Sequence, residues 1–137
     1  MKTRLFMLVW VVVISGVLFC PACKKSSSSE YSQLYYTWEW VRSSGGIGGV
    51  EMTPDSEGYN QSIAFEENGT YTIYRNDTVV GSGTYTITRA ESLLDQQEYD
   101  MVMFDDGTAA QAITMLSDNA LTLREECFDC FIHIYLR

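Results

Sequence analysis

The sequence predicts an all-β domain, in which an antiparallel up-and-down meander closes into an eight-stranded barrel behind an N-terminal signal helix. Apolar and polar residues alternate over 70–74 and 83–87 with the period of two that half-buried strands show. Turn signals such as Asn68-Gly69 and Asp106-Gly107 separate the alternating stretches. Beyond the N-terminal segment, no stretch has a convincing helical period. Closure into a barrel is expected because it removes the exposed strand edges that invite aggregation.

The predicted strands follow one another with short connections, except after the first. That first strand covers 35–42, where Trp38 and Trp40 share one face by alternation and are expected to lie in the core. The stretch 43–61 is rich in glycine, shows no strand period, and is expected to form a loop over one mouth of the barrel. Gly81 and Gly83 indicate a bend or bulge in the strand that contains them. The remaining seven strands are predicted over 62–66, 70–75, 78–88, 99–104, 109–115, 120–125 and 131–137.

The N-terminal segment is predicted to lie outside the fold. Lys2 and Arg4 precede an apolar stretch over 5–19, an order typical of a secretory signal, and the stretch is shorter than the ~20 residues of a transmembrane helix. Ala22-Cys23 resembles the end of a bacterial lipobox, whose cysteine becomes the lipid-modified N-terminus. We therefore predict a lipoprotein signal peptide over 1–22, lipidation at Cys23, a flexible tether over 23–33 and a barrel domain over 34–137. An ordinary cleaved signal and an uncleaved anchor remain as alternatives.

The predicted location is the cell envelope, with attachment to the membrane through the N-terminal lipid. By resemblance to sorted lipoproteins, Lys24 after the cysteine favours the outer membrane. Removal of the signal takes Lys2 and Arg4 from the nine basic residues, so seven remain against 18 acidic ones, a net charge near −11. This charge argues against nucleic acid as a partner, because nucleic acid requires basic patches. A solvated acidic surface keeps an exported protein soluble.

The cysteines and the histidine of the mature chain indicate a staple rather than a catalytic site. Cys127 and Cys130 flank a predicted turn that brings their Cα atoms within about 7 Å, and export favours a disulfide over free thiols or a metal site. His133 is the only histidine, so a two-histidine metal site is excluded and no Ser/His/Asp set can be read. We therefore predict no enzyme activity, no cofactor and no metal.

Several segments, taken in order, carry a resemblance to a known family. They are 37–41, 43–46, 65–71, 83–87, 121–123 with Cys127, and 135–137. In this order they resemble the small lipocalin-like, calycin-type lipoproteins of Bacteroidota. The resemblance implies a barrel closed at one end by Trp38 and by an arginine near the last strand, for which we favour Arg137 over Arg124. Such barrels usually have a glycine two residues before the tryptophan, where this chain has Tyr36.

The resemblance also implies a small apolar ligand inside the barrel. An eight-stranded barrel is either filled by its side chains or has room for one small ligand. The alternative is therefore a filled-core structural or protein-interaction module of the cell envelope, with an envelope protein as partner and no small-molecule ligand. The positions predicted to face a ligand or to fill the core are Trp40, Phe65, Tyr71, Tyr85, Met101 and Met103.

Overall fold

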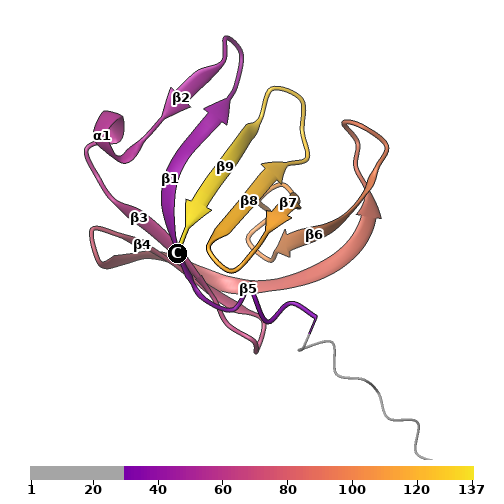
Figure 1. Cartoon of the computed structure of the whole chain (residues 1–137), viewed down its shortest axis with the longest axis horizontal. Coiled ribbons are helices and arrows are strands. Elements are labelled where there is room, and N and C mark those ends of the chain that lie inside the picture. The colour runs from indigo at the N-terminus through magenta and orange to yellow at the C-terminus, as the bar shows by residue number, and fades with distance from the viewer. Residues whose placement is uncertain (1–29) are drawn as a thin grey trace, which may run out of the picture.

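The computed structural model describes residues 30–137. Its strands all belong to one antiparallel sheet, in which each strand pairs with the next in the sheet (Figure 1). Nearly every described segment is a strand or the turn between two strands. The elements are β1 (Thr37–Gly45), β2 (Val50–Met52), α1 (Pro54–Glu57), β3 (Gln61–Phe65), β4 (Thr70–Arg75), β5 (Thr78–Glu91), β6 (Glu98–Phe104), β7 (Gln111–Leu116), β8 (Ala120–Glu125) and β9 (Phe131–Leu136).

Eight of these strands form the barrel that the sequence predicts. They pair in the order β1-β3-β4-β5-β6-β7-β8-β9. The cylinder is closed by the pairing of β1 with β9, which runs from the pair Glu39–Leu136 to the pair Gly45–Phe131. The first half of β5 pairs with β4 and the second half with β6, which explains its length of 14 residues. The all-β class and the closed antiparallel barrel are confirmed.

The prediction that 43–61 lacks regular structure is wrong in part. β1 continues to Gly45, and β2 pairs with this last part of β1. α1 is a single turn, capped by the side chain of Thr53, and the described residues contain no helix with the length and hydropathy needed to cross a bilayer. The alternating pattern of a strand cannot be seen in this stretch of the sequence, because β2 has only three residues and none of them is buried.

The two asparagine-led turns differ in backbone geometry. Asn76 and Asp77 have φ angles of 47° and 62°, so this pair forms the two-residue turn between β4 and β5. In the Asn68-Gly69 turn only Gly69 has a positive φ, 83°, and its N–H donates to the carbonyl oxygen of Glu66 at 3.0 Å. The loop between β3 and β4 is therefore longer than the tight turn that the dipeptide indicates.

A register shift in β5 confirms the expected bulge. Ile73 pairs with Gly81 and Tyr74 pairs with Val79, which leaves one extra residue, Val80, on β5. An extra residue of this kind bends a strand and increases its twist. In Figure 1, β5 is the long curved strand that sweeps across the lower part of the barrel and rises beside β6.

The segment ahead of β1 closes one end of the barrel. Leu34 is fully buried, and its carbonyl oxygen accepts a hydrogen bond of 2.9 Å from Nε1 of Trp38. Tyr31 and Tyr35 pack against the same core cluster. Figure 1 shows this indigo segment beside the end of the barrel at which β1 begins. The predicted signal peptide, Cys23 and residues 24–29 of the predicted tether lie outside the described residues.

Most of the predicted inward positions are buried, but Met103 is not. Trp40, Phe65, Tyr71, Tyr85 and Met101 are at most 7% exposed, whereas Met103 is 44% exposed. Val102 belongs to the fully buried core cluster, so alternation directs both neighbouring methionines to the outer face of β6. Met101 is nevertheless buried on that face, where it pairs with the equally buried Ala112. The prediction for Met103 is therefore wrong, because the register of β6 places Val102 inside.

A polar cluster ties the β5–β6 connection to the outside of β8. The guanidinium of Arg124 bonds to Asp95 at 2.9 Å, to Glu126 at 3.1 Å and to Ser92 Oγ at 2.9 Å, and it lies over the ring of Tyr99. The hydrogen bond from Arg124 is the main reason that the pKa of Asp95 is lowered, to about 2. Arg124 therefore fastens an outer turn and does not close the barrel end.

We predict that the Asp95–Arg124 contact stabilises the barrel at neutral pH and that this stabilisation is lost in acid. The folded state holds the pKa of Asp95 below its ordinary value, so the stabilisation is complete above about pH 4 and is lost as the pH falls toward 2. Urea unfolding at pH 5, 4, 3 and 2 measures this effect. The variant Asp95→Asn should lose less stability than the wild type over this window. The control Glu67→Gln, at an exposed position, should follow the wild type, and an unchanged slope in Asp95→Asn would contradict the prediction.

We predict that Leu34→Ala destabilises the protein by about 2–5 kcal/mol, because it opens a void in the plugged end of the barrel. Chemical unfolding of the full chain measures the loss. Leu93→Ala removes the same atoms from a side chain that is 75% exposed, so its free energy of unfolding should change by less than about 0.5 kcal/mol. Equal losses in the two variants would show that Leu34 does not seal the core.

Candidate ligand-binding cavity

A cavity of about 240 Å³ lies in the barrel at the end opposite to Leu34. Ser43 near the end of β1, Gln61 at the start of β3 and Gln111 at the start of β7 all line it, and these strand ends meet at the same mouth. Pockets for drug-sized ligands measure roughly 300–1,000 Å³. This end of the barrel is therefore hollow, with room for one molecule smaller than a drug, whereas Leu34 and Trp38 are fully buried toward the other end.

Aromatic side chains dominate the cavity wall. Trp40 stacks on Tyr59 with ring centroids 6.0 Å apart, and Tyr71 meets Phe104 edge to face at 4.8 Å. Tyr135 completes the set of five rings. Tyr59 comes from the connection between α1 and β3, so the stretch 43–61 does contribute to the mouth, as expected.

One carboxylate lies at the exposed rim of the cavity. Asp106 accepts hydrogen bonds from the hydroxyl of Tyr71 at 3.1 Å and from the backbone N–H of Thr108 at 2.8 Å. Hydrogen bonds, first of all those with Thr108, lower the pKa of Asp106, whereas burial raises the pKa of the Tyr71 phenol. At neutral pH the cavity therefore presents an ionised carboxylate beside a neutral phenol. No lysine or arginine of residues 30–137 lines it.

Gly83 lets the ring of Tyr71 lie close to β5. A Cβ atom at this position would lie 3.0 Å from Cε1 of Tyr71 and would collide with the carboxylate of Asp105. That carboxylate is held in place, since it accepts hydrogen bonds of 3.0 Å from both the N–H and the hydroxyl of Thr84. The glycine thus has a packing role next to the cavity, whereas the bulge lies at Val80, next to Gly81.

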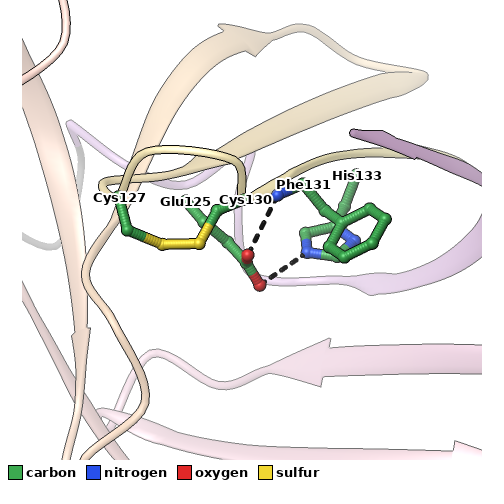
Figure 2. Close-up of a disulfide and its surroundings, with 5 residues drawn as sticks. All are labelled: Glu125, Cys127, Cys130, Phe131 and His133. Atoms are coloured by element: carbon green, nitrogen blue, oxygen red, sulfur yellow. Dashed lines mark hydrogen bonds and ion pairs between the residues drawn. A yellow bond between two sulfur atoms is a disulfide. The ribbon is translucent and has the colours of Figure 1, made fainter. Parts of the chain in front are cut away.

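A hydrogen-bond chain forms another part of the wall, because Trp40, Ser43 and His133 all line the cavity. Trp40 Nε1 donates to Ser43 Oγ at 2.8 Å, and Ser43 Oγ lies 2.6 Å from His133 Nδ1. His133 Nε2 lies 3.1 Å from one oxygen of Glu125, whose other oxygen accepts the backbone N–H of Phe131 at 3.0 Å (Figure 2). Every group is satisfied if Nε2 carries the proton and Nδ1 accepts the serine hydroxyl, and we assign that tautomer.

The Ser43–His133–Glu125 chain has the residue types of a hydrolytic triad. Sequence analysis did not find it because its members come from β1, β9 and β8 and share no motif. Ser43 is only 2% exposed, and its oxygen already accepts a hydrogen bond from Trp40. It also lies within a strand that is paired on both sides, where the ladder engages the N–H groups that an oxyanion would need. We interpret the chain as a fixed wall, and the absence of enzyme activity stays a prediction.

A disulfide joins Cys127 and Cys130 in the turn between β8 and β9, with Cα atoms 5.5 Å apart (Figure 2). This confirms the predicted staple. Asp129 in the turn has a φ of 60°, and Phe128 at its tip is 81% exposed. Glu125 lies close to both sulfur atoms, but a disulfide has no thiolate with which to bind a metal.

The aromatic partner of Arg137 is not the expected one. The guanidinium carbon lies 3.8 Å from the ring centroid of Tyr36, at the position where lipocalin-type barrels usually have glycine. Trp38 is fully buried and bonds to Leu34 instead. The ring of Tyr36 is thus the stacking partner of Arg137 in place of Trp38. Arg137 contacts the end of the barrel through this ring.

The six positions predicted to face a ligand or to fill the core fall into three groups. Trp40 and Tyr71 line the cavity. Phe65 and Tyr85 pack edge to face in the core with centroids 5.0 Å apart, and the two methionines lie on the outer face. The sequence analysis did not identify Tyr59, Asp106 or Thr108 as cavity residues. The only signal for them was the Asp-Gly turn, which indicates chain reversal and not a binding site.

Comparison of the chain with known protein families, with characterised proteins and with solved structures finds no significant match. The resemblance to lipocalin-like lipoproteins therefore stays a prediction. What can be said of function rests on the cavity and on the residues around it.

We predict that Ser43→Ala destabilises the protein by about 1–3 kcal/mol, because it leaves the buried indole N–H of Trp40 without an acceptor. Urea unfolding at pH 7 measures the change. The neighbouring variant Ser44→Ala removes a hydroxyl on the opposite face of β1 and should change the free energy of unfolding by less than about 0.5 kcal/mol. A neutral effect of Ser43→Ala would mean that the wall does not depend on this hydrogen bond.

Proposed function

We propose that this protein is a lipid-anchored lipoprotein of the cell envelope, with a lipocalin-like barrel that binds one small ligand in its mouth cavity. The observation that carries the proposal is the cavity of about 240 Å³ lined by aromatic rings, which lies beyond the buried core cluster that contains Leu34 and Trp38. Its wall is held by hydrogen bonds between Trp40, Ser43 and His133, so the site exists before a ligand arrives.

The position of the chain's start fits an anchored binding module. Tyr31, Leu34 and Tyr35 pack at the closed end, so the described part of the chain begins on the side away from the cavity. Lys2, Arg4, the apolar stretch and Ala22-Cys23 support a lipid anchor at Cys23. Such an anchor would be joined to the barrel through its closed end, so the attachment itself does not cover the mouth. We propose the outer membrane as the location, on the basis of Lys24.

A second candidate function, a protein-interaction module, is favoured by two apolar loop tips. Ile47 is 87% exposed and Phe128 is 81% exposed. Their loops are neighbours, since the N–H of Gly46 donates to the carbonyl oxygen of Cys130 at 3.3 Å. A partner that cross-links to the wild type but not to an Ile47→Ser, Phe128→Ser double variant would support this function.

The ligand-binding proposal is tested by filling the cavity. Ile73→Phe projects a larger side chain into it from β4, whereas Thr72→Phe makes a bulky substitution on the neighbouring residue, which does not line it. In calorimetric titrations of the full chain with 2-phenylethanol, Ile73→Phe should weaken binding at least about tenfold, and Thr72→Phe should bind as the wild type does. The full chain is kept in detergent micelles in every titration. Partition of 2-phenylethanol into the micelles is therefore the same for all samples and cancels.

Native mass spectrometry of the protein extracted from envelopes provides a second readout. We expect an additional small mass on the wild type that is absent from Ile73→Phe. Equal binding of 2-phenylethanol by the two phenylalanine variants, or its absence in the wild type, would contradict a ligand site in the cavity.

A further inference from the structure

We propose that the ligand of the mouth cavity is a small organic cation, an aromatic or alkyl ammonium ion. This inference rests on the proposed ligand binding and names the chemical class that the site accepts. It replaces the uncharged apolar ligand that the family resemblance implies. Three independent observations lead to it: the charge at the rim, the rings of the wall and the charge of the whole barrel.

The first observation is the charge of the lining. Asp106 is the only carboxylate among the lining side chains, and no arginine or lysine of the described residues lines the cavity with it. The lining histidine, His133, is paired with Glu125 and not with Asp106. Its hydrogen bonds come from Tyr71 and Thr108, which are neutral groups, so its charge is not neutralised within the cavity. The neighbouring carboxylate, Asp105, is directed to Thr84 and does not line the cavity. An ammonium group at the rim would therefore meet one oriented, unneutralised carboxylate.

The second observation is the aromatic wall. The faces of tryptophan and tyrosine rings attract cations, and walls of several rings are a recurrent means of binding ammonium ligands. One ring of this wall already has such a contact: Arg75 lies over Tyr59 with its guanidinium carbon 3.9 Å from the ring centroid. Within residues 30–137, no arginine lies over the rings of Trp40, Tyr71 or Tyr135. These rings remain available to a ligand.

The third observation is the charge of the barrel itself. Residues 30–137 contain all 18 acidic residues and only five arginines, with no lysine, a formal charge of −13. Each arginine also has a partner within the barrel. Arg42, Arg89 and Arg124 form ion pairs, and Arg75 and Arg137 cover tyrosine rings. A field of this sign concentrates small cations at the mouth and repels anions.

These observations also argue against an anionic ligand such as a fatty acid. Its carboxylate would need a cationic partner, and no arginine or lysine of residues 30–137 lines the cavity. The one lining histidine, His133, already has both ring nitrogens hydrogen-bonded, to Ser43 and to Glu125. The volume of about 240 Å³ further limits the ligand to one ring with a short arm, or to a compact alkyl ammonium.

The test uses three probes that share a phenyl ring and differ in charge: 2-phenylethylammonium, 2-phenylethanol and 3-phenylpropanoate. Each is titrated calorimetrically into the full chain at pH 7. We expect the ammonium probe to bind about tenfold more tightly than the alcohol, and the carboxylate probe to bind most weakly. Asp106→Asn should reduce the affinity for the ammonium probe about tenfold and leave the affinity for the alcohol unchanged.

Asp105→Asn is the matched control, because it removes the same charge one residue away without altering the lining. It should change the affinity for the ammonium probe less than about threefold, since a more distant charge is screened by solvent. The thermal unfolding of both variants is measured in parallel, and the affinity for the alcohol reports whether the cavity is intact.

The outcomes separate this inference from the proposed function. Equal affinities for the three probes, or tighter binding of the carboxylate probe, would overturn the cation site and leave ligand binding in place. Equal effects of Asp105→Asn and Asp106→Asn would also overturn it, because the preference would then come from overall charge. If none of the probes bound to the wild type, both this inference and the proposed cavity function would fail.

Discussion

The pairing of β1 with β9 is the constraint on which the rest of this structure depends. It turns an open meander into a cylinder, so that each barrel strand has a partner on both sides. The same pairing places Ser43 beside His133 and so assembles the hydrogen-bond chain in the cavity wall. Without closure, neither an inside nor a mouth would exist, and Trp40 and Tyr135 would share no cavity.

The two ends of the cylinder differ because different side chains occupy them. At one end Leu34 and Trp38 are fully buried, and the indole N–H of Trp38 donates to the carbonyl oxygen of Leu34. At the other end several inward side chains are aromatic rings, and hydrogen bonds such as that from Tyr71 to Asp106 hold them in place. A cavity of about 240 Å³ remains between them. A filled end supplies the stability that allows the open end to keep space for a ligand.

Polar contacts on this barrel have two different roles, stabilisation of the fold and the proposed binding of a ligand. On the outside, Arg124 gathers Asp95 and Glu126 and fastens the β5–β6 connection to β8, where the charges are largely neutralised. At the mouth, Asp106 has neutral partners only and keeps its charge available. The first arrangement stabilises the fold, and the second favours recognition of a cation. The difference follows from which strands place an arginine nearby, and composition does not reveal it.

The sequence by itself determined the all-β class, most strand positions, the burial of Trp38, Trp40 and Phe65, and the Cys127–Cys130 staple, because alternation and short turns are local properties. It did not reveal β2, whose three residues show no pattern, or the outward direction of Met103, which depends on register. Only the tertiary structure decided that the barrel keeps a cavity and that Asp106, Tyr59 and His133 meet around it. These residues are far apart in the chain, and the shear of a closed sheet, which no local pattern encodes, sets their distances.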